Sequence, residues 1–427
     1  MIDIRTLREN PEKVKEAMKK RLVDTDIGEL IALDKKWRSL KREEEMLRKK
    51  RNEISRRVNS AKGAERLSLI REAKVMPGKI KKFKSQRESL GKRIKSTLEC
   101  LPNITHESVP LGETEEKAKI VRQWGKLPTF PFKPKAHWEL GEALGILDLE
   151  RSALMAGSGY YVLKGIGARL ERALINLMLD FHEKHGFTEV VPPLLVLSGA
   201  MYGTSQLPKF EEDLFKTCSG SYLIPTAEVP LANMHAGETL EEKKLPLKYC
   251  AFTPCFRKEA GKHGKETRGI FRLHQFSKVE MVAFTTQERS YEMLEELRGY
   301  AEKLLELLEV PYRTRILPSG DMSFASAKTY DIECYAAAQN RFLEVSSVSN
   351  CTDFQARRMR TKYNTGKETK FVHTLNASGL ALPRLVISLL ENNQTKEGTV
   401  KVPKKLQPHL GIKEIKQFRG SAPPKRI

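Results

Sequence analysis

The sequence predicts an α+β protein in which a long helical hairpin precedes a domain that contains antiparallel strands. Residues 28–58 and 65–100 carry sparse Leu, Ile, Trp, Met and Val at three- and four-residue steps among dense charge, which is the pattern of a two-stranded antiparallel coiled coil. Residues 250–281 place polar and aromatic side chains at strand spacing on both sides of a glycine-rich basic loop, which indicates a β-hairpin. At 427 residues the chain exceeds one ordinary core, so two or more domains are expected.

The turn of the helical hairpin is predicted at residues 59–65, NSAKGAE. Pro77 and Gly78 lie inside the second helical stretch, and proline removes a backbone donor and clashes with the preceding turn. We therefore expect a kink there, or a tip of the hairpin displaced to that point. A hairpin of this kind could also be only a dimerisation device, and the pattern alone slightly favours that alternative.

Positive charge is concentrated in the first quarter of the chain. The formal net charge is +22, and residues 1–100 contain 30 Lys and Arg against 16 Asp and Glu. Such an excess favours a polyanionic partner, so the helical hairpin is the expected nucleic-acid contact. For part of these lysines, a solvated helix face is a sufficient explanation.

The chain has no apolar run of about 18 residues, so no membrane span is expected. Its first residues carry acids and lack an apolar core segment, which argues against a secretory signal or organellar presequence and favours a cytoplasmic enzyme. The six cysteines form no C-x-x-C pair, so we expect reduced, mostly buried thiols and neither disulfides nor a zinc ribbon. His182 and His185 are three residues apart rather than the four of a zinc-protease helix, which predicts surface histidines.

The predicted β-hairpin has the chemistry of a nucleotide site. A guanidinium at Arg257 can neutralise a phosphate, Glu259 can accept a hydrogen bond from an exocyclic amine, and Phe276 can stack on a purine. Strand alternation places residues 257 and 259 on one face. The residues of the returning strand that share one parity are Arg272, Phe276, Lys278 and Glu280. Both sets are expected to converge on one ligand.

The pattern FRxE, loop, RxxxF resembles motif 2 of the class II aminoacyl-tRNA synthetases, and the longer string FRKEAGKHGKETRGIFRLHQFSKVE resembles the seryl-tRNA synthetase family. The segments MIDIRTLRENPEKVKEAMKKR and LPNITHESVPLG, on either side of the helical hairpin, are similar to that family's N-terminal arm. The resemblance implies an antiparallel catalytic sheet flanked by helices. It also implies an arm that grips the long variable arm of the tRNA through phosphate and shape contacts.

The same resemblance divides the chain into four segments. Residues 1–101 are the expected tRNA-binding coiled-coil domain, 102–135 a linker, 136–420 the class II catalytic domain and 421–427 a basic tail. Residues 168–196, a helix followed by FTEVVPPLLV, resemble motif 1, which builds the dimer interface, although an ordinary helix and strand would look the same.

Three further segments resemble parts of a synthetase active site. LIPTAEVPL, residues 223–231, matches the family's serine-binding TxE motif, in which Glu228 and Thr226 take the ammonium group. Residues 328–363 resemble the strand that carries Glu344 and Ser347, two oxygen ligands for Mg²⁺ bound with ATP, although EVSS could be an ordinary strand. Residues 376–394 resemble motif 3, in which Arg384 near a helix N-terminus faces the ATP γ-phosphate.

The resemblance implies a complete set of site residues. The two residues expected to be catalytic are Arg257 and Arg384. The expected serine-binding residues are Thr226, Ala227, Glu228, Glu280, Asn376 and Ser378. The expected ATP-binding residues are Arg257, Lys258, Glu259, Arg272, Phe276, Glu344, Val345, Ser346, Ser347 and Arg384, with Glu344 and Ser347 also holding Mg²⁺. Glu280 and Ser378 are expected to read the serine hydroxyl. Arg357 and Arg358 are interpreted as structural or tRNA-facing.

The sequence departs from the family pattern at several positions. Ala377 and Pro383 replace two glycines of motif 3, Ser205 replaces a glycine, and Val348 replaces a cysteine. The pair Cys334 and Tyr335 stands where Val and Trp are usual. Added methyls beside a ligand could narrow the pocket, so catalytic efficiency is in question.

The implied protein is a homodimeric ligase that uses ATP to join L-serine to the 3′ end of serine tRNA through a seryl-adenylate. Whether it also charges selenocysteine tRNA stays open. A non-catalytic tRNA-binding paralogue would be expected to lose the ATP ligands, and a carrier-protein aminoacylating ligase would lack the long hairpin. The zinc-dependent form of the synthetase is disfavoured by the TAE turn and the unpaired cysteines, so no zinc is expected.

Overall fold

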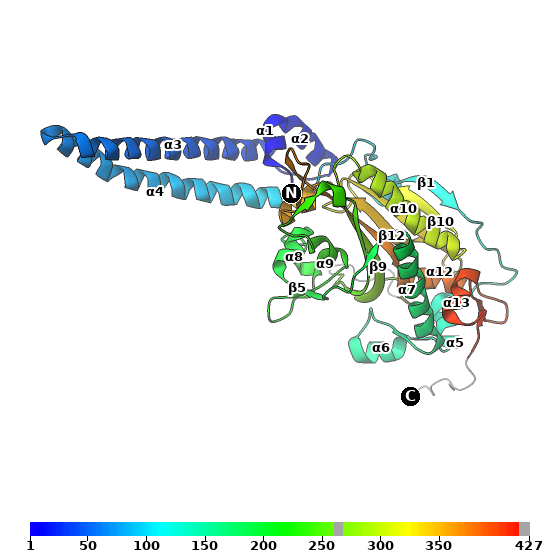
Figure 1. Cartoon of the computed structure of the whole chain (residues 1–427). Helices are drawn as coiled ribbons and strands as arrows, with labels where there is room; N and C mark the ends of the chain where they lie inside the picture. The colour runs from blue at the N-terminus through cyan, green and yellow to red at the C-terminus, as the bar shows by residue number, and fades with distance from the viewer. Residues whose placement is uncertain (260–267, 418–427) are drawn as a thin grey trace. The chain divides into compact units, whose positions relative to one another are not determined.

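The computed structural model describes residues 1–259 and 268–417, and the chain divides into two compact units, Met1–Ile104 and Thr105–Ile427. The first unit is helical, with α1 (Ile4–Glu9), α2 (Pro11–Lys20), α3 (Ile27–Ser60) and α4 (Gly63–Glu99). Helices α3 and α4 form the predicted antiparallel hairpin (Figure 1). Short polar side chains cap the starts of α1, α2 and α3: Asp26, for example, accepts a hydrogen bond from the backbone of Glu29.

Helix α4 runs through Pro77 without interruption, and the hairpin turns at residues 61–62. The expectation of a tip displaced to Pro77 was therefore wrong. Met76 and Ile80, on either side of the proline, are both buried. Packing of this apolar face offsets the hydrogen bond that a proline removes from a helix interior.

The hairpin seam combines apolar residues with two buried carboxylates. Arg8 and Arg38 both hydrogen-bond to Asp34, at 2.7–2.9 Å for Arg8 and 2.9 Å for Arg38. Glu44 accepts from Arg87 of α4 at 2.8 Å and from Arg48 of α3 at 2.6 Å. The apolar side chains of the seam are Leu30, Leu40, Ile54, Leu69, Met76, Ile80, Ile94 and Leu98. Asp34 ties α3 to α1, whereas the buried Glu44 pairs with Arg87 of α4 and so favours one register of the two hairpin helices.

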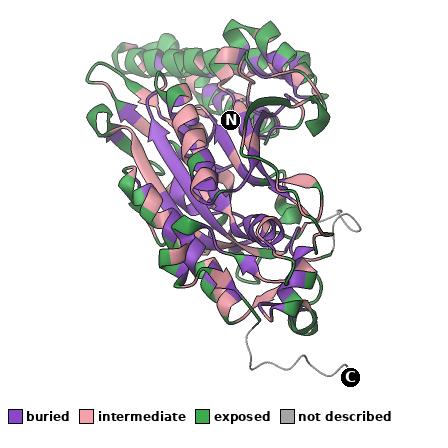
Figure 2. Cartoon of the chain, turned by 90° about the vertical axis from the view of Figure 1, so that its right-hand side faces the viewer, coloured by how far each residue is buried: buried purple, intermediate pink, exposed green. Residues whose placement is uncertain are grey.

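The second unit is built on an eight-stranded sheet in the order β1-β10-β11-β12-β15-β9-β8-β4. Every neighbouring pair is antiparallel except β4 and β8, which run parallel. In that order the strands are Lys119–Trp124, Tyr312–Ile316, Lys328–Ala336, Arg341–Asn350, His373–Ala381, Gln275–Thr285, Leu247–Phe256 and Thr188–Glu189. Strand β1 lies within the stretch predicted as a linker. Figure 2 shows that most of the sheet is buried.

Two sets of helices accompany the sheet. Those whose residues join the main core are α5 (His137–Ala143), α7 (Ile166–Lys184), α10 (Ser290–Leu307), α12 (Leu382–Asn392) and α13 (Gln407–Leu410). Those of two smaller cores are α8 (Ser198–Gly203), α9 (Glu228–Asn233) and α11 (Phe354–Met359). The other α-helix of this unit is α6 (Leu149–Ala156), and its short strands are β2 (Leu147–Asp148), β3 (Val162–Leu163), β5 (Leu195–Val196), β6 (Tyr222–Leu223), β7 (Thr239–Glu241), β13 (Lys362–Asn364), β14 (Thr369–Phe371), β16 (Val400–Lys401) and β17 (Glu414–Ile415).

Strand β9 shows how the sheet separates core from site. Its odd-numbered residues Val279, Met281 and Ala283 are buried in the main core with α7 and α10. Its even-numbered residues Lys278 and Glu280 point to the opposite face, as alternation along a strand requires. The first face is therefore packed against helices, while on the second face Lys278 and Glu280 line a cavity and Val282 and Phe284 join a smaller core.

The sequence predicted that His182 and His185 both lie on the surface, and for His182 this was wrong. His182 is fully buried and packs beneath Gly379, where an added Cβ would approach its Nε2 atom to 2.4 Å. Burial lowers the pKa of His182 to about 3, so its ring is neutral. His182 follows Leu174 and Met178 at four-residue steps, and this helical spacing puts it on the apolar face.

All six cysteines are unbridged, and four of them are buried: Cys250, Cys255, Cys334 and Cys351. Burial raises the pKa of Cys250 and Cys334 to about 12, which keeps these thiols protonated and unreactive. Within residues 1–259 and 268–417, no helix is long and apolar enough to cross a bilayer.

Candidate active site

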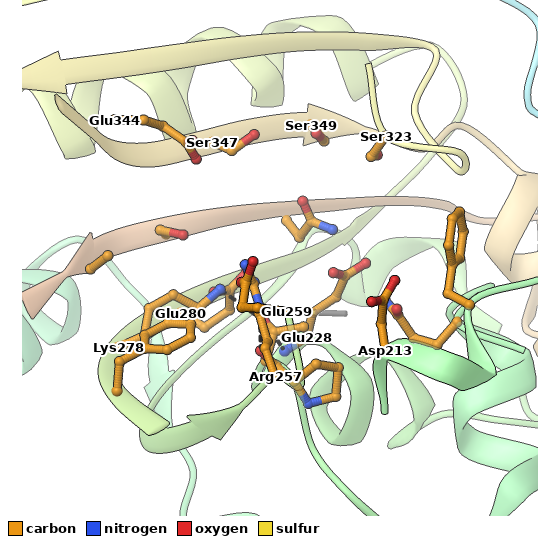
Figure 3. A pocket seen from close by; sticks show the side chains of 18 of the residues that line it. Asp213, Glu228, Arg257, Glu259, Lys278, Glu280, Ser323, Glu344, Ser347 and Ser349 are labelled. Carbon is orange, nitrogen blue, oxygen red and sulfur yellow. Dashed lines mark hydrogen bonds and ion pairs between the residues drawn. The ribbon is translucent and has the colours of Figure 1, made fainter. Parts of the chain in front are cut away.

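A cavity of about 580 Å³ lies on the face of the sheet opposite the main core and spans strands β12, β15 and β9 (Figure 3). Most residues predicted for the site line it. These are Thr226, Glu228, Arg257, Glu259, Arg272, Phe276, Glu280, Glu344, Val345, Ser347, Asn376, Ser378 and Arg384. Three predicted residues, Ala227, Lys258 and Ser346, are not among its lining; Ala227 and Ser346 are buried beside it.

The hairpin strands are shorter than the sequence predicted. Strand β8 ends at Phe256 and β9 begins at Gln275, so Arg257, Glu259 and Arg272 lie just beyond the regular ladder. The chain nevertheless stays paired at this end, because the amide of Arg257 donates to the carbonyl of His274 at 2.8 Å. Residues 260–267, the centre of the predicted basic loop, lie outside the described residues.

Phe276 and Arg257 pack against each other at the expected nucleotide end of the cavity. The guanidinium carbon of Arg257 lies 5.1 Å from the Phe276 ring centroid, and its Nε donates to the carbonyl of Pro225 at 3.3 Å. These contacts fix the guanidinium on one face of the ring and orient it into the cavity.

Arg272 and Glu259 form an ion pair with 2.9 Å between Nη1 and Oε2. Glu259 has a backbone φ of 50°, a left-handed conformation that is uncommon for a residue other than glycine. Two of the charged groups that the sequence assigned to ATP are therefore engaged with each other.

A β-bulge brings Glu344 and Ser347 to the same cavity although they are three positions apart, an odd spacing. The register between β11 and β12 shifts at Ile332 and Glu333, and this shift leaves Val345 without an opposite residue. Because the bulge lies between Glu344 and Ser347, both side chains reach the cavity face. A regular strand would have turned one of them toward the core.

Arg384 joins the strand of Glu344 to the start of helix α12. Its Nη1 donates to the Glu344 carbonyl at 2.8 Å and lies 3.3 Å from the Glu344 carboxylate. Pro383 occupies the first turn of α12, where no intrahelical donor is lost. The replacement of glycine at position 383 therefore leaves the guanidinium in the cavity lining.

Glu228 is a partly buried acid of the site with two side-chain partners. Its carboxylate accepts from Gln355 Nε2 at 2.6 Å and hydrogen-bonds to Asn376. Burial raises the pKa of the Glu228 carboxyl and the nearby Glu280 carboxylate raises it further, while Gln355, Lys278 and Asn376 oppose that rise. A carboxylate in this position is destabilised until a cation approaches, which suits an ammonium ligand.

Lys278 and Thr226 complete the same end of the cavity. Lys278 forms an ion pair with Glu280, and its ammonium donates to Thr226 Oγ1 at 2.9 Å. The amide of Glu228 also donates to Thr226 Oγ1, at 3.2 Å. With two hydrogen bonds already accepted, the Thr226 hydroxyl has a proton to donate to a ligand, whereas the sequence suggested an acceptor.

The other departures from the family pattern fit the fold in different ways. Val348 and Ala377 are both fully buried and face each other across β12 and β15, so their side chains do not enter the cavity. Ser205 adopts a φ of 70°, a conformation that favours glycine, and its backbone strain is therefore a cost of the serine. Cys334 is buried and contacts the Arg384 carbonyl through its thiol at 3.8 Å.

Arg358 is structural. It is buried, and its Nη1 donates to the carbonyls of Tyr202 and Leu207 at 3.4 and 3.1 Å, which ties α11 to the segment that borders the cavity. Arg357 pairs with Asp353 at 2.6 Å. Of the two interpretations left open by the sequence, the structure supports the structural one for both arginines.

The sequence prediction gave no role to Gln355, which contacts Glu228 from outside the cavity, and expected of Lys278 only that it faces the ligand. Gln355 lies 127 residues from Glu228 in the chain, and only the fold brings the two together. Lys278 shares strand parity with Phe276 and Glu280, so its place in the cavity followed from alternation. Its hydrogen bond to Thr226 could not be predicted from alternation.

Family comparisons agree with this geometry. Residues 1–105 match the family described as "Seryl-tRNA synthetase N-terminal domain". Residues 215–393 match the "tRNA synthetase class II core domain (G, H, P, S and T)".

Individual relatives cover almost the whole chain. The serine-tRNA ligase of Thermodesulfovibrio yellowstonii is 48% identical over 97% of this chain and 100% of its own length. That of Thermotoga neapolitana is 49% identical over the same shares. The seryl-tRNA synthetase of Pyrococcus horikoshii, solved with ATP, superposes with a TM-score of 0.94 at 40% identity, covering 98% of this chain and 100% of that one. The cytoplasmic enzyme of Naegleria fowleri, solved with AMP, gives 0.89 at 34% identity, covering 98% and 99%. The chain therefore belongs to the seryl-tRNA synthetase family of class II aminoacyl-tRNA synthetases.

Proposed function

We propose that this protein uses ATP to join L-serine to the 3′ end of serine tRNA through a seryl-adenylate. The observation that carries the proposal is one cavity that combines an arginine stacked on an aromatic ring, a second arginine at a helix start, and an enclosed acid. These are Arg257, Arg384 and Glu228. Solved relatives that hold ATP and AMP support a nucleotide in this cavity.

The serine end lies between Glu228 and Glu280. In this assignment the ammonium group of serine binds the Glu228 carboxylate, and the Thr226 hydroxyl donates to a ligand oxygen. Glu280 and Ser378 face each other across β9 and β15 and read the serine hydroxyl. Alanine would leave these buried polar groups unpaired, which is the physical basis for its rejection.

Adenylation needs positioning and charge neutralisation rather than a protein nucleophile. A carboxylate oxygen of serine attacks the α-phosphorus, the bond from that phosphorus to the α–β bridging oxygen breaks, and pyrophosphate leaves. Arg257 neutralises the α-phosphate while Arg272 and Arg384 hold the departing pyrophosphate. A ribose hydroxyl of the tRNA then attacks the seryl carbonyl, and AMP leaves.

ATP-dependent synthetases of this class work with a divalent metal ion, and the cavity has donors of the right kind. The Glu344 carboxylate and the Ser347 hydroxyl are hard oxygen ligands on one strand face. Behind them, Asp331 hydrogen-bonds to Ser347, and its buried Oδ1 has no partner among the described residues. We assign Mg²⁺ as the ion; it would neutralise phosphate charge, with Glu344 and Ser347 holding it.

We also propose a cytoplasmic homodimer that binds tRNA through the N-terminal hairpin. The segment after α7 exposes three apolar side chains, Val191, Leu195 and Leu197, at 90%, 51% and 74%. Exposed apolar residues grouped in one segment are typical of an interface, and this segment resembles motif 1. The basic excess of residues 1–100 supports the tRNA assignment.

Exchange of labelled pyrophosphate into ATP with each of the twenty amino acids tests the proposal. We expect exchange with serine and none with alanine, threonine or cysteine above background. Exchange with another amino acid alone would overturn the serine assignment. Absence of exchange with every amino acid would favour a non-catalytic tRNA-binding protein.

A further inference from the structure

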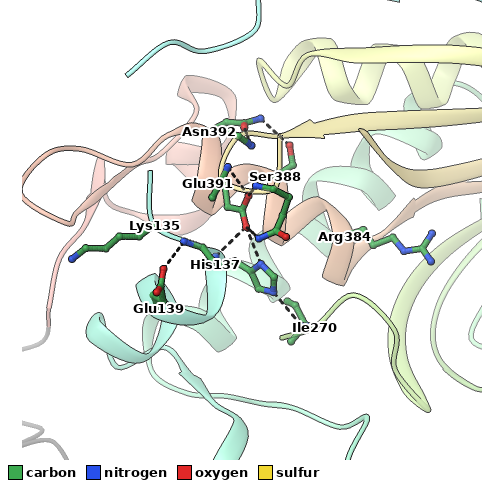
Figure 4. A network of polar contacts seen from close by, with 12 residues as sticks. Lys135, His137, Glu139, Ile270, Arg384, Ser388, Glu391 and Asn392 are labelled. Atoms are coloured by element: carbon green, nitrogen blue, oxygen red, sulfur yellow. Dashed lines mark hydrogen bonds and ion pairs between the residues drawn. The ribbon is translucent and has the colours of Figure 1, made fainter. Parts of the chain in front are cut away.

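A fully buried histidine and a fully buried glutamate connect helix α12 to the segment that leads into Arg272. His137, at the start of α5, and Glu391, near the end of α12, are both 0% exposed. His137 Nδ1 lies 2.9 Å from Glu391 Oε1, and its Nε2 lies 3.2 Å from the amide nitrogen of Ile270 (Figure 4). Neither residue lines the cavity.

The direction of each hydrogen bond follows from its partners. The Ile270 amide can only donate, so His137 Nε2 is the acceptor and Nδ1 carries the proton that Glu391 accepts. Glu391 also accepts from the amides of His137, Ala338 and Gln339 at 3.0–3.2 Å. Every polar atom of this pair has a partner, which makes the cluster rigid.

Close packing against His137 restricts the backbone on both sides of Ile270. Gly269 has a φ of 78°, and an added Cβ there would come within 2.1 Å of His137 Nε2. The rings of His137 and Phe271 meet edge to face with centroids 5.3 Å apart. The backbone of residues 269–271 is therefore held against the imidazole.

Helix α12 holds this segment at two successive residues. Arg384 Nε donates to the carbonyl of Phe271 at 3.4 Å, and Glu391 reaches Ile270 through His137. Arg384 and Glu391 are seven residues apart and so lie on one face of the helix. Arg272 directly follows Phe271 in the chain and lines the cavity.

We propose that His137, oriented by Glu391, is a positioning residue that fixes the location of Arg272 for binding ATP. This inference rests on the proposed function, because it presumes that ATP occupies the cavity. The pair acts through the backbone of Ile270 and Phe271, and touches neither substrate. Glu228, Glu280 and the serine end have no part in the network.

The test compares two substitutions that each remove a buried hydrogen bond to a buried glutamate. H137F keeps an aromatic ring but loses both ring hydrogen bonds. T314V is the control: Thr314 Oγ1 donates to the buried Glu302 at 2.7 Å, and neither residue lines the cavity. Calorimetric titration with ATP alone should show affinity about tenfold weaker in H137F and unchanged in T314V. Serine affinity should be unchanged in both.

A matched pair of variants covers the case in which H137F does not fold. The shorter asparagine side chain of H137N offers a donor where Nδ1 stood, whereas the longer glutamine side chain of H137Q offers an acceptor near the place of Nε2. H137N should weaken ATP binding as H137F does, and H137Q should restore part of it. Unchanged ATP affinity in H137F or H137N, or equal losses for ATP and serine, would overturn the inference. Failure of the wild-type protein to bind ATP would instead overturn the proposed function.

Discussion

Gln355 presents its amide to Glu228 in one orientation only. Its Nε2 donates to Glu228 Oε1 over 2.6 Å, while its Oε1 accepts from the Thr374 hydroxyl over 2.7 Å. Because Thr374 occupies the carbonyl end, the amide cannot turn over without losing both hydrogen bonds. The acid proposed to bind the serine ammonium is thereby held in place by a side chain from helix α11.

Replacing Gln355 by leucine should therefore weaken serine binding and spare ATP. Loss of the donor leaves Glu228 partly unpaired and free to turn, which we expect to raise the KM for serine by about tenfold to a hundredfold. Pyrophosphate exchange at varied serine and varied ATP concentrations separates the two effects. Q287L, which removes a hydrogen bond to the Phe371 carbonyl away from the cavity, is the control. An equal loss for both substrates would contradict this role.

Serine affinity should fall as the solution becomes acidic, and at a higher pH than for an ordinary glutamate. Burial raises the pKa of Glu228, so as the pH falls its carboxylate takes up a proton earlier than an exposed glutamate does. Once protonated, it no longer attracts the ammonium group of serine. Gln355 lowers this pKa, so Q355L should move the decline to still higher pH. Calorimetric titration of serine at a series of pH values measures both shifts. A pH-independent affinity down to about pH 4 would refute the assignment of Glu228.

The substitution R257A should nearly abolish adenylation. A fixed cation beside the developing phosphorane charge contributes several kcal/mol, so exchange should fall by at least about a hundredfold. R289A removes an arginine whose side chain is 49% exposed and which pairs only with Glu292 of its own helix segment in the ion pairs described; it should leave exchange unchanged. Near-normal exchange in R257A would mean that the motif 2 interpretation is wrong.

Deletion of residues 28–100, with a short flexible bridge, should separate the two half-reactions. Every proposed ATP and serine ligand lies beyond residue 225, so adenylate formation should persist. Aminoacylation of tRNA should collapse, because a basic hairpin binds RNA largely by phosphate contacts and counterion release. In the intact protein, tRNA affinity should fall steeply with added salt while exchange changes little. Charging at the full-length rate after deletion would mark the hairpin as an oligomerisation or solubility element.

Asp148 should stabilise the fold at neutral pH and lose that effect in acid. Burial alone would raise its pKa, but hydrogen bonds from Lys164 and from the backbone and side chain of Arg151 outweigh it and lower the pKa to about 2. A lowered carboxyl pKa contributes stability above the unfolded value near 3.8, and that contribution disappears as pH falls toward 2.

The substitution D148N should thus cost about 2 kcal/mol in urea unfolding at neutral pH, and the difference should shrink below about pH 4. D180N, at an exposed position of α7, is the control and should show no such trend. A constant difference between wild type and D148N across this range would contradict the charge-based explanation.

Strand alternation and family motifs made much of the site predictable. Phe276, Lys278 and Glu280 were recognised because β9 is regular where they lie. Glu344 and Ser347 came only from the motif, since their odd spacing contradicts alternation and a bulge at Val345 was needed to reconcile it. The assignment of the α+β class with an N-terminal helical hairpin was confirmed.

Long-range partners could not be predicted from one sequence. Gln355 and Glu391 meet their partners across 127 and 254 residues of chain, and no local pattern marks them. The error at His182 was avoidable, because its four-residue spacing from Met178 already placed it on the apolar face of α7. Helix α4 passed through Pro77 because packing against α3 overrode a local breaker.

The ion pair between the buried Glu44 and Arg87 fixes the register, and with it the length, of the N-terminal hairpin. If α4 slid by one helical turn, the buried Glu44 would keep Arg48 of its own helix but lose Arg87, its partner on α4, and this loss opposes the slide. The 34 residues of α3 therefore span about 50 Å, and this length does not change when tRNA binds. A different reach requires insertion or deletion of matched residues in both helices, in steps of about 10 Å per heptad.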